Sequence, residues 1–397
     1  MVVWKSIEDM GSFFGGLTGK TKEDFQKGNA KFITYMNVFA NPSLDINTTG
    51  VVKINQGEKQ NKIQKGDILF SGSSETPEEA GMSCVVTDDL EEDYYMNSFC
   101  FGLRLNNPEQ YNLHYLKHIL RSYNIRQAIS KTASGVTRFN ISKARFGKVQ
   151  IPIPSLQEQK RIVGILDTFT DSIENLKLQI AQRRKQYEFY RDQLFDNVSF
   201  KEKIGRLTKV FSCPRVYKDQ WKDLGIPFWR SSDVMSYHNR VKNPRGEVFI
   251  SQSLYDELIQ KSEKIEEGDI LVTGGGSIGI PYLKRDNNPL FVKDADLICI
   301  KKCVDVIPSF LYHFFFSTNF RLYLKVITHD ATIAHYTINQ IIETPVPLPP
   351  LAEQQRIVSI LDTFEASISN LEAQLEQRQK QYEYYRNKLL SFEKEEQ

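Results

Sequence analysis

The chain has 397 residues, of which 40% are hydrophobic and 25% are charged, and its formal net charge is +2. This composition is typical of a soluble globular protein with two to four domains. It excludes a membrane-spanning protein, because no apolar run reaches the ~18 residues that a span requires. The first ten residues already include Lys5 and Glu8, and the five cysteines are scattered and odd in number. We therefore expect no signal peptide, and a cytoplasmic protein with reduced thiols and no membrane contact.

Residues 1–150 are expected to form a first globular domain that mixes short strands with a helix. The stretch KGDILFSGSS (65–74) places a Gly-Asp turn before a short apolar strand and ends in a loop of small residues. A helix is expected near the end of the domain, at about 111–131. Between Gln110 and Gln150 the chain has eight lysines and arginines and no acidic residue. Such a stretch indicates either a surface for a polyanion or a solvated helix face, and both interpretations stay open.

Residues 151–200 contain a segment that recurs at the C-terminus of the chain. Ile151–Phe195 and Val346–Leu390 align without a gap, and 27 of 45 positions are identical, including the pentapeptide ILDTF in both copies. Chance does not produce this similarity, so the segment is an internal duplication.

Each copy of the repeat is predicted to be one long helix. Apolar residues recur at alternating steps of four and three from Ile162 to Leu194, which is the spacing of a heptad repeat. Both copies have an arginine at the same interior position of this repeat, as Arg183 and Arg378.

The sequence also indicates where these helices begin. Ser155 and Glu158 have the spacing of a capping box, and Pro350 suits the first residue of a helix. The preceding IPIP and VPLP stretches are expected to be extended, because proline disfavours helix in the residue before it.

Residues 201–345 are expected to form a second globular domain that resembles the first. A second helix is expected at about 308–325. Three pairs of segments match faintly between the two domains: KFITYMNV (31–38) with PFWRSSDV (227–234), KGDILFSGSS (65–74) with EGDILVTGGG (267–276), and TRFNIS (137–142) with AHYTIN (334–339).

The order of the segments predicts an α+β fold with internal pseudo-two-fold symmetry. The first long helix leaves the first globular domain and leads into the second, and the second long helix starts at the second domain. If matching faces of the two helices pack, the helices must run antiparallel as a coiled-coil rod of roughly 60 Å between two similar heads. The expected domains are 1–150, 151–200, 201–345 and 346–397.

No catalytic constellation is found in the sequence. GGLTGKT (15–21) is similar to a phosphate-binding loop, but that motif requires glycine where the chain has Phe14. Cys299 and Cys303 have no second cysteine or histidine pair nearby, and His114 and His118 are expected at a helix surface rather than at a metal. We therefore expect no catalytic residue, no bound metal and no cofactor in this chain.

The repeated pattern resembles a known family. IPIP or VPLP followed by x-L-x-E-Q-x-R-I-V-x-I-L-D and a heptad helix, present twice, is similar to the specificity (S) subunits of type I restriction–modification systems. SGVTRFNIS (134–142) also resembles that family, whereas DATIAHYTIN (330–339) in the second domain departs from it.

The resemblance implies two target recognition domains that each read one half of a bipartite site in double-stranded DNA. It implies that the helices dock two methylation (M) subunits, through which restriction (R) subunits join. Such a complex is a DNA adenine methyltransferase and ATP-dependent restriction endonuclease. S-adenosylmethionine, ATP and Mg would belong to the partner subunits, and this chain would be non-catalytic on its own.

The resemblance also implies that base-reading residues lie in loops of both heads. In the major groove arginine suits guanine edges and asparagine suits adenine edges. The candidates for contact with DNA are Thr18, Lys20, Tyr35, Asn37, Ser73, Ser74, Ser134, Thr137, Arg138 and Asn140 in the first head, and Arg230, Ser232, Asp233, Gly275, Ser277, His335 and Tyr336 in the second head.

Two other functions are weighed against this one. A coiled-coil scaffold without DNA specificity would explain the heptads but not the basic stretch between residues 110 and 150. A nucleotide-binding enzyme would use Gly15–Thr21. The sequence does not give the recognised bases or the length of the gap between the two halves of the DNA site.

Overall fold

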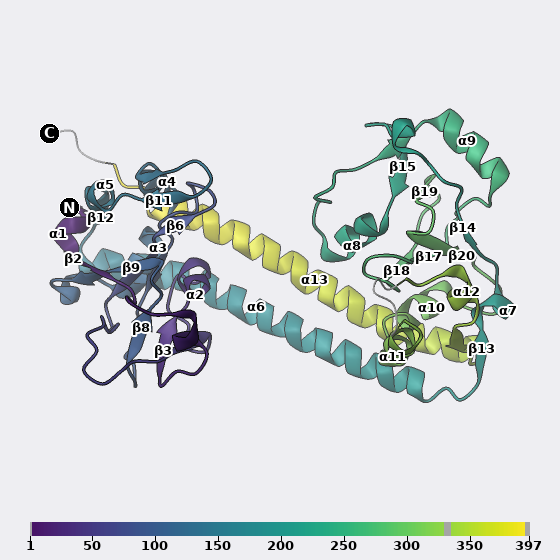
Figure 1. The fold of residues 1–397 in the computed structure, drawn as a ribbon, viewed down its shortest axis with the longest axis horizontal. Coiled ribbons are helices and arrows are strands. Elements are labelled where there is room, and N and C mark those ends of the chain that lie inside the picture. Colours follow the sequence, from purple (N-terminus) through teal and green to yellow (C-terminus); the bar gives the residue numbers. More distant parts are fainter. Residues whose placement is uncertain (1, 329–334, 394–397) are drawn as a thin grey trace. The chain divides into compact units, whose positions relative to one another are not determined.

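The computed structural model describes residues 2–328 and 335–393 (Figure 1). The chain forms two compact units: unit 1 comprises residues 1–177 and 373–397, and unit 2 comprises residues 178–372. Two long helices, α6 (Leu156–Asp196) and α13 (Leu351–Leu389), each begin in one unit and end in the other. The predicted four-part division stays an interpretation of the sequence repeat. Among the described helices, not one combines the length and the apolar run that crossing a lipid bilayer requires.

Unit 1 is built from short strands and short helices around the start of α6 and the end of α13. Its strands are β1 (Val3–Ser6), β2 (Gly11–Gly15), β3 (Ala30–Ile33), β4 (Thr49–Val52), β5 (Ile68–Ser71), β6 (Ser73–Ser74), β7 (Ser83–Val85), β8 (Tyr94–Met96), β9 (Cys100–Leu105), β10 (Ala133–Ser134), β11 (Phe139–Ile141) and β12 (Gln150–Ile153). Its short helices are α1 (Ile7–Met10), η1 (Lys22–Phe25), α2 (Tyr35–Ala40), η2 (Pro108–Gln110), α3 (Leu113–Ile119), α4 (Tyr123–Ser130) and α5 (Lys143–Gly147).

Unit 2 has the same kind of elements in nearly the same order. Its strands are β13 (Lys201–Lys203), β14 (Val210–Ser212), β15 (Ile226–Trp229), β16 (Phe249–Ile250), β17 (Ile270–Thr273), β18 (Pro281–Leu283), β19 (Phe291–Val292), β20 (Leu297–Ile300) and β21 (Pro345–Pro347). Its short helices are α7 (Ile204–Leu207), η3 (Lys218–Gln220), α8 (Ser231–Asn239), α9 (Gln252–Lys261), α10 (Pro308–Phe314), α11 (Thr318–Ile327) and α12 (Ile338–Ile342).

The sheets of unit 1 recur in unit 2, which confirms the predicted duplication. The four-stranded sheet β2-β9-β5-β7 corresponds to β14-β20-β17-β18, and β4-β3-β8 corresponds to β16-β15-β19. In the second pair of sheets, the contacts β3–β8 and β15–β19 are both parallel. The pair β1-β12 corresponds to β13-β21. Unit 1 adds the small sheet β10-β11-β6, and the matching part of unit 2 falls partly on residues 329–334, which lie outside the described range.

The two Gly-Asp turns form where the sequence predicts them. Gly66 has a φ of 89° and Gly268 a φ of 91°, which is the left-handed region that glycine adopts without a Cβ clash. The aspartate that follows is buried in both units. Asp67 accepts hydrogen bonds from Arg104 at 2.9 and 2.7 Å, and Asp269 accepts one from Lys301 at 2.8 Å. Each turn is thereby tied to a neighbouring strand of its four-stranded sheet, to β9 in unit 1 and to the residue after β20 in unit 2.

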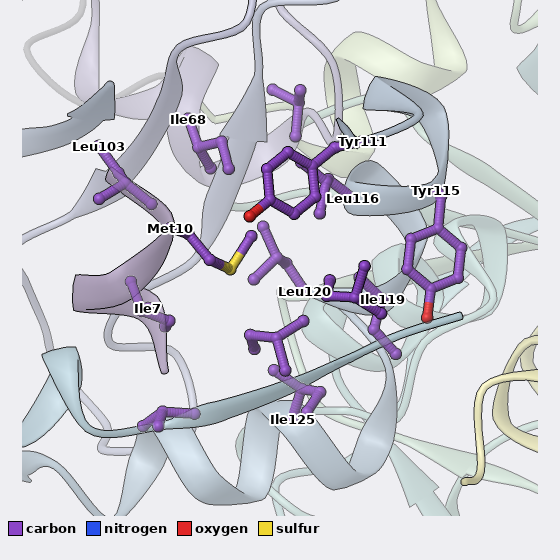
Figure 2. Packing of buried hydrophobic residues seen from close by; sticks show 14 of the residues in the cluster. Ile7, Met10, Ile68, Leu103, Tyr111, Tyr115, Leu116, Ile119, Leu120 and Ile125 are labelled. Carbon is purple, nitrogen blue, oxygen red and sulfur yellow. The ribbon is translucent and has the colours of Figure 1, made fainter. Parts of the chain in front are cut away.

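The core of unit 1 joins its largest sheet to α1 and to the helices near residues 111–130 (Figure 2). Ile7 and Met10 of α1 lie in the same buried cluster as Leu116, Leu120 and Ile125 (Figure 2). The same cluster includes side chains from α6 and from the end of α13. A full burial of one such side chain is worth about 1.5–3 kcal/mol, so the long helices are firmly attached to this sheet.

Within each unit the two long helices pack antiparallel. In unit 1, Ile162 and Leu166 of α6 lie in one cluster with Leu390, while Phe169 contacts the more N-terminal Arg378. In unit 2, Phe195 of α6 lies in one cluster with Ile357 and Leu361 of α13, and Arg184 bonds to Glu372 at 2.6 Å.

The arginines of the heptad repeat lie over aromatic rings within their own units. Arg378 lies over Phe169 at 5.6 Å in unit 1, and Arg183 lies over Phe364 at 5.8 Å in unit 2. A charged side chain at an interior helix position is thereby matched to an aromatic face.

Three details differ from the expectations. The helices predicted at about 111–131 and 308–325 are each split in two, as α3 with α4 and as α10 with α11. α13 begins at Leu351, so Pro350 lies one residue before it. The proposed match of TRFNIS with AHYTIN is out of register by two residues, because Ser142 and Thr337 are the equivalent N-cap residues of α5 and α12. Ala334, the first residue of AHYTIN, lies outside the described residues.

The five cysteines are unpaired, as predicted. Burial raises the pKa of Cys84 to about 12 and that of Cys213 to about 12, which keeps these thiols protonated.

Candidate nucleic-acid interface

Four of the predicted residues of unit 1 meet on the small sheet β10-β11-β6. Ser134 pairs with Asn140 across β10 and β11, Asn140 pairs with Ser73, and Phe139 pairs with Ser74. The hairpin between β10 and β11 contains Thr137 and Arg138, and both are exposed. Segments that are more than sixty residues apart in the sequence are thus joined into one polar surface, in which Ser134 and Asn140 are exposed and Ser73 and Ser74 are buried.

Arg138 is held from two sides, while the end of its side chain faces solvent. Its Nε donates to the hydroxyl of Ser73 at 3.1 Å, and its guanidinium lies 5.4 Å from the centre of the Phe99 ring. Among the described residues its two terminal nitrogens have no hydrogen-bond partner. A guanidinium that is fixed at its base and free at its end can donate two parallel hydrogen bonds to the O6 and N7 atoms of guanine.

The hairpin that carries Arg138 depends on a glycine. Gly135 has a φ of 154°, and a Cβ there would lie 1.9 Å from the carbonyl oxygen of Arg138. Val136 follows at the tip and is 91% exposed. Tyr35 supports the neighbouring strand, because its hydroxyl donates to the carbonyl of Ser73 at 2.8 Å. Tyr35 therefore lies next to the polar surface.

The other three candidates of unit 1 bond to residues of unit 1 that lie outside this small sheet. Thr18 is exposed, and its backbone exchanges hydrogen bonds with the side chain of Gln60. Lys20 donates to Glu58, and this hydrogen bond, together with those from Asn55 and Gln60, lowers the pKa of Glu58 to about 2. Asn37 is buried and donates to the carbonyls of Asp45 and Thr48 at 2.7 and 2.9 Å. The structure does not bring these three onto the sheet of Arg138.

The glycine-rich loop of unit 2 (Gly274–Gly279) occupies the corresponding place. Ile141 donates its amide to Gly72 in unit 1 at 2.9 Å, and Tyr336 donates its amide to Gly274 in unit 2 at 2.9 Å. His335 is therefore the counterpart of Asn140, and a Cβ on Gly275 would lie 3.9 Å from its Nδ1.

The two remaining candidates, Ser277 in this loop and Tyr336 next to His335, differ in exposure. Ser277 is exposed and its carbonyl accepts from Thr273, whereas Tyr336 is fully buried and its hydroxyl bonds to Thr344 at 2.5 Å. Burial raises the pKa of Tyr336.

Arg230, Ser232 and Asp233 form a second group in unit 2. Arg230 is buried and donates to Asp233 at 2.9 Å and to the carbonyl of Gly246 at 2.6 Å. Asn243 donates to both Ser232 and Asp233. The hydrogen bonds of this group fasten the loop after α8, so in this structure its polar atoms are engaged within the unit.

Two residues at these sites were missed by the sequence analysis. Phe99 is 58% exposed, although large aromatic side chains are usually covered. In unit 2, Asp296 lies at the glycine-rich loop, where its carboxylate is 3.1 Å from Lys293 and its carbonyl accepts from Gly274 at 2.8 Å. Neither lies in a motif, and only the strand pairing brings them to the hairpin and the loop.

The basic stretch of residues 110–150 is not one continuous surface. Lys131, Arg138, Lys143, Arg145 and Lys148 are exposed, which fits a polyanion surface.

Three other basic residues of the stretch have internal roles. Lys117 bonds to Asp167 at 2.8 Å. Arg121 donates to the carbonyls of Val38, Phe39, Asn41 and Ser83, and Arg126 donates to those of Glu78, Ala80 and Gly81. Burial lowers the pKa of each arginine to about 10, yet each stays charged at neutral pH.

The segment Gly15–Thr21 does not have the structure of a nucleotide-binding loop. Such a loop connects a strand to a helix whose N-terminus faces the phosphates. Here β2 ends at Gly15, Thr21 precedes only the four-residue η1, and Lys20 is paired with Glu58. The structure therefore gives no support to nucleotide binding at this segment.

One group of possible metal ligands occurs among the described residues. It consists of His313, Asp362 and Glu365, whose ligand atoms lie within 4.8 Å of one another. Both ring nitrogens of His313 already have partners, since Nε2 is 2.8 Å from Asp362 and Nδ1 is 2.9 Å from the hydroxyl of Tyr187. This arrangement joins α10 to both long helices.

The same arrangement joins α3 to both long helices in unit 1. His118 lies 2.7 Å from Asp167 and 2.9 Å from the hydroxyl of Tyr382. His118 is fully buried, so the expectation that it lies on a helix surface is wrong.

Comparison with known proteins agrees with this architecture. The chain matches the family described as "Type I restriction modification DNA specificity domain" over residues 1–183 and again over residues 201–379. A type I restriction enzyme specificity subunit of Haemophilus influenzae is 31% identical over 304 residues, which is 72% of this chain and 74% of that protein.

Two solved structures share the fold. The crystal structure of a type I restriction-modification S subunit from M. genitalium aligns with a TM-score of 0.55 at 15% identity, over 99% of this chain and 97% of the other. A chain from a study of complex assembly and conformational transition of a type I R-M system aligns with a TM-score of 0.61 at 16% identity, over 98% and 97%.

The matched ranges cover most of the chain and contain both the Arg138 hairpin of unit 1 and the glycine-rich loop of unit 2. The chain therefore belongs to the type I restriction modification DNA specificity family, as its sequence pattern predicts. This membership supports DNA sequence recognition as its function, and the exposed Arg138 hairpin is a surface suited to that function.

Proposed function

We propose that each unit reads one half of a bipartite site in double-stranded DNA. The proposal rests on one observation. The two units share a strand framework, but they have different side chains at equivalent positions of that framework. In unit 1 the framework presents Arg138 and Asn140, with the buried Ser73 holding Arg138, and in unit 2 it presents His335, Gly275 and Ser277. Two copies of one framework that offer different hydrogen-bonding groups suit two different short sequences.

The exposed lysines and arginines around the hairpin of unit 1 support contact with phosphates. Phosphate contacts fix the orientation of a protein on the duplex, and base contacts provide the specificity. Lys131 and Lys143 flank the hairpin in the sequence and are both exposed. In this proposal they position the hairpin, and Arg138 reads a base.

The long helices are the proposed docking elements for two methylation subunits, through which restriction subunits join. Exposed aromatic residues on the helices support a partner surface, since Phe189 is 58% exposed and Tyr384 is 59% exposed. The assembled complex would be a DNA adenine methyltransferase and ATP-dependent restriction endonuclease. S-adenosylmethionine, ATP and Mg would be bound by the partners, while this chain would bind no cofactor.

The test of the proposal is an exchange of one head. Residues 1–150 are replaced by the equivalent domain of a relative, and the methylated motif of the assembled complex is mapped by sequencing. We expect one half of the motif to change and the other half to stay as it was. A change in both halves, or in neither, would contradict separate reading by the two units.

A further inference from the structure

Position 99 of unit 1 and position 296 of unit 2 are structurally equivalent. The amide of Gly72 donates to the carbonyl of Phe99 at 2.8 Å, and the amide of Gly274 donates to the carbonyl of Asp296 at 2.8 Å. The next residue opens β9 in unit 1 and β20 in unit 2, and both strands pair antiparallel with the strand that follows the Gly-Asp turn. The backbone therefore presents both side chains at the same end of the same strand.

The neighbours of these two side chains are equivalent as well. The strand residue after Asn140 bonds to Gly72, and the residue after His335 bonds to Gly274, both at 2.9 Å. In unit 1 the small-residue loop therefore has Asn140 on one side and Phe99 on the other. In unit 2 the corresponding loop has His335 on one side and Asp296 on the other.

The side chains at these two equivalent positions differ in polarity and charge. Phe99 offers an apolar ring, and the guanidinium of Arg138 lies 5.4 Å above it. Asp296 offers a carboxylate, which is 3.1 Å from Lys293 and would lie 3.7 Å from a Cβ on Gly275. An aromatic face orients a guanidinium, whereas a carboxylate can only accept hydrogen bonds.

We infer that this position determines one base of each half-site. In unit 1, Phe99 positions Arg138 so that its guanidinium donates to the O6 and N7 atoms of a guanine. In unit 2, Asp296 accepts a hydrogen bond from the exocyclic amino group of a cytosine. The inference rests on the proposed function and adds to it the residues that distinguish the two half-sites.

The experiment selects bound sequences from a randomised DNA library. The full-length chain is used alone and with the methylation subunits proposed above. The variants are Phe99→Asp, Phe99→Tyr, Asp296→Asn and Arg138→Ala. Phe200→Asp is the matched control, because Phe200 is 59% exposed and lies outside both sites.

For Phe99→Asp we expect the preference at one position of the first half-site to fall about tenfold, which is the usual discrimination of one good base contact. The second half-site should stay unchanged. Asp296→Asn should change one position of the second half-site only, because an amide can donate as well as accept. Phe99→Tyr keeps the ring and should retain the preference, as should the control.

The outcomes separate this inference from the proposed function. If Arg138→Ala relaxes one position but Phe99→Asp and Asp296→Asn leave all positions unchanged, the inference is wrong and DNA reading by the units stands. If the head exchange and Arg138→Ala both leave the selected sequences unchanged, the proposed function itself fails.

Circular dichroism checks folding, and Phe99→Leu replaces Phe99→Asp if the latter does not fold. Loss of preference then supports the role of the ring, and retention overturns it.

Discussion

In unit 1 the buried ring of His118 lies between Asp167 of α6 and Tyr382 of α13; in unit 2 the ring of His313 lies between Asp362 of α13 and Tyr187 of α6. Each long helix therefore supplies the aspartate of one unit and the tyrosine of the other. A single helix sequence must contain both residues to serve both units. This requirement gives a physical reason for two similar helices, each with the pentapeptide ILDTF.

Other identical positions of the repeat make equivalent contacts. Phe169 stacks on Tyr385 in unit 1 with ring centres 5.3 Å apart, and Phe364 stacks on Tyr190 in unit 2 with ring centres 5.5 Å apart.

The repeated glutamine has the same role in both units. Gln159 accepts from the amide of Asn112 at 2.8 Å, and Gln354 accepts from the amide of Ile307 at 2.9 Å. The junction between the globular part and the helices is thus a shared feature of the two units.

The positions that differ lie both beside these shared contacts and in the loops. Lys117 on α3 pairs with Asp167 in unit 1, while unit 2 has Glu365 beside His313. At the hairpin and the glycine-rich loop, Phe99 and Asp296 occupy the same place. The comparison indicates that the duplicated junction holds each unit together, while the loops were free to acquire different side chains. The following experiments test this division.

The largest effect is expected from lengthening both helices together. Seven residues of heptad pattern are inserted after Lys177 and after Glu372, where each helix passes from one unit to the other. Seven residues add about 10 Å of helix, which equals about three base pairs of DNA. If the helices set the spacing of the half-sites, the gap of the methylated motif should grow by about three bases, with both half-sites unchanged.

A control insertion of seven residues after Gly57, in an open loop of unit 1, should leave the gap as it was. Methylation mapping decides the matter. An active double insertion with the original gap would show that the helices do not determine the spacing.

The second prediction tests the junction by removing its histidine from one unit at a time. His118→Ala leaves Asp167 and Tyr382 without their shared buried partner, and His313→Ala does the same to Asp362 and Tyr187. We expect each variant to lose about 2–4 kcal/mol of unfolding free energy. Tyr382→Phe and Tyr187→Phe remove one hydrogen bond each and should cost about 1 kcal/mol.

Hydrogen exchange shows where the stability is lost. The loss in His118→Ala should be confined to residues of unit 1, and that in His313→Ala to residues of unit 2. Uniform loss across both units in either variant would argue against two junctions of equal and separate function.

The third prediction distinguishes structural from functional basic residues. Arg126 donates to three carbonyls in unit 1, whereas its counterpart Arg321, among the residues that the structure describes, donates to the carbonyl of Ile278 at 3.3 Å. Arg126→Ala should cost about 2–3 kcal/mol of stability, and Arg321→Ala about 1 kcal/mol. Arg138→Ala should change stability by less than about 0.5 kcal/mol, because its side chain is exposed. Denaturant unfolding measures all three, and a large loss for Arg138→Ala would make the hairpin arginine structural.

The sequence predicted the long helices, the duplication and the Gly-Asp strands correctly, because these follow from local spacing. Heptad steps specify a helix, and glycine before a buried aspartate specifies a turn. The candidate site was predicted only in part. Ser73 and Arg138 were identified, but Phe99 reaches Arg138 only through strand pairing, which sequence spacing does not reveal.

The basic stretch shows the same limit. Arg121, Arg126 and Arg138 look alike in the sequence, yet two of them bind loop carbonyls inside unit 1 and one faces solvent. Counting charges cannot distinguish the buried arginines from the exposed one, because burial depends on how the preceding loops of the chain pack against the helices that contain these arginines. Likewise, the two-residue error at the match of TRFNIS arose because only the caps of α5 and α12 fix that register.

The smallest expected effect concerns Glu365, which has no acidic counterpart in unit 1, where the equivalent residue is Thr170. Glu365 faces Tyr312, His313, Asp362 and Arg285, and burial raises its pKa above the ordinary value of 4.5. A raised pKa means that the folded state holds the proton more tightly than the unfolded state does. The stability that this proton contributes is complete below pH 4.5 and is lost as the pH rises through the raised pKa.

Glu365→Gln cannot lose a proton, so it should unfold at a higher temperature than the wild type at pH 8 and at nearly the same temperature at pH 4.5. Glu353→Gln is the matched control on the same helix. Hydrogen bonding from Arg356 lowers the pKa of Glu353, and its side chain lies at the surface, so its replacement should bring no gain at pH 8. Thermal unfolding of the three proteins between pH 4.5 and pH 8 measures the difference. A gain for Glu365→Gln that is equal at both ends of this range would mean that packing, and not the buried charge, distinguishes this junction from that of unit 1.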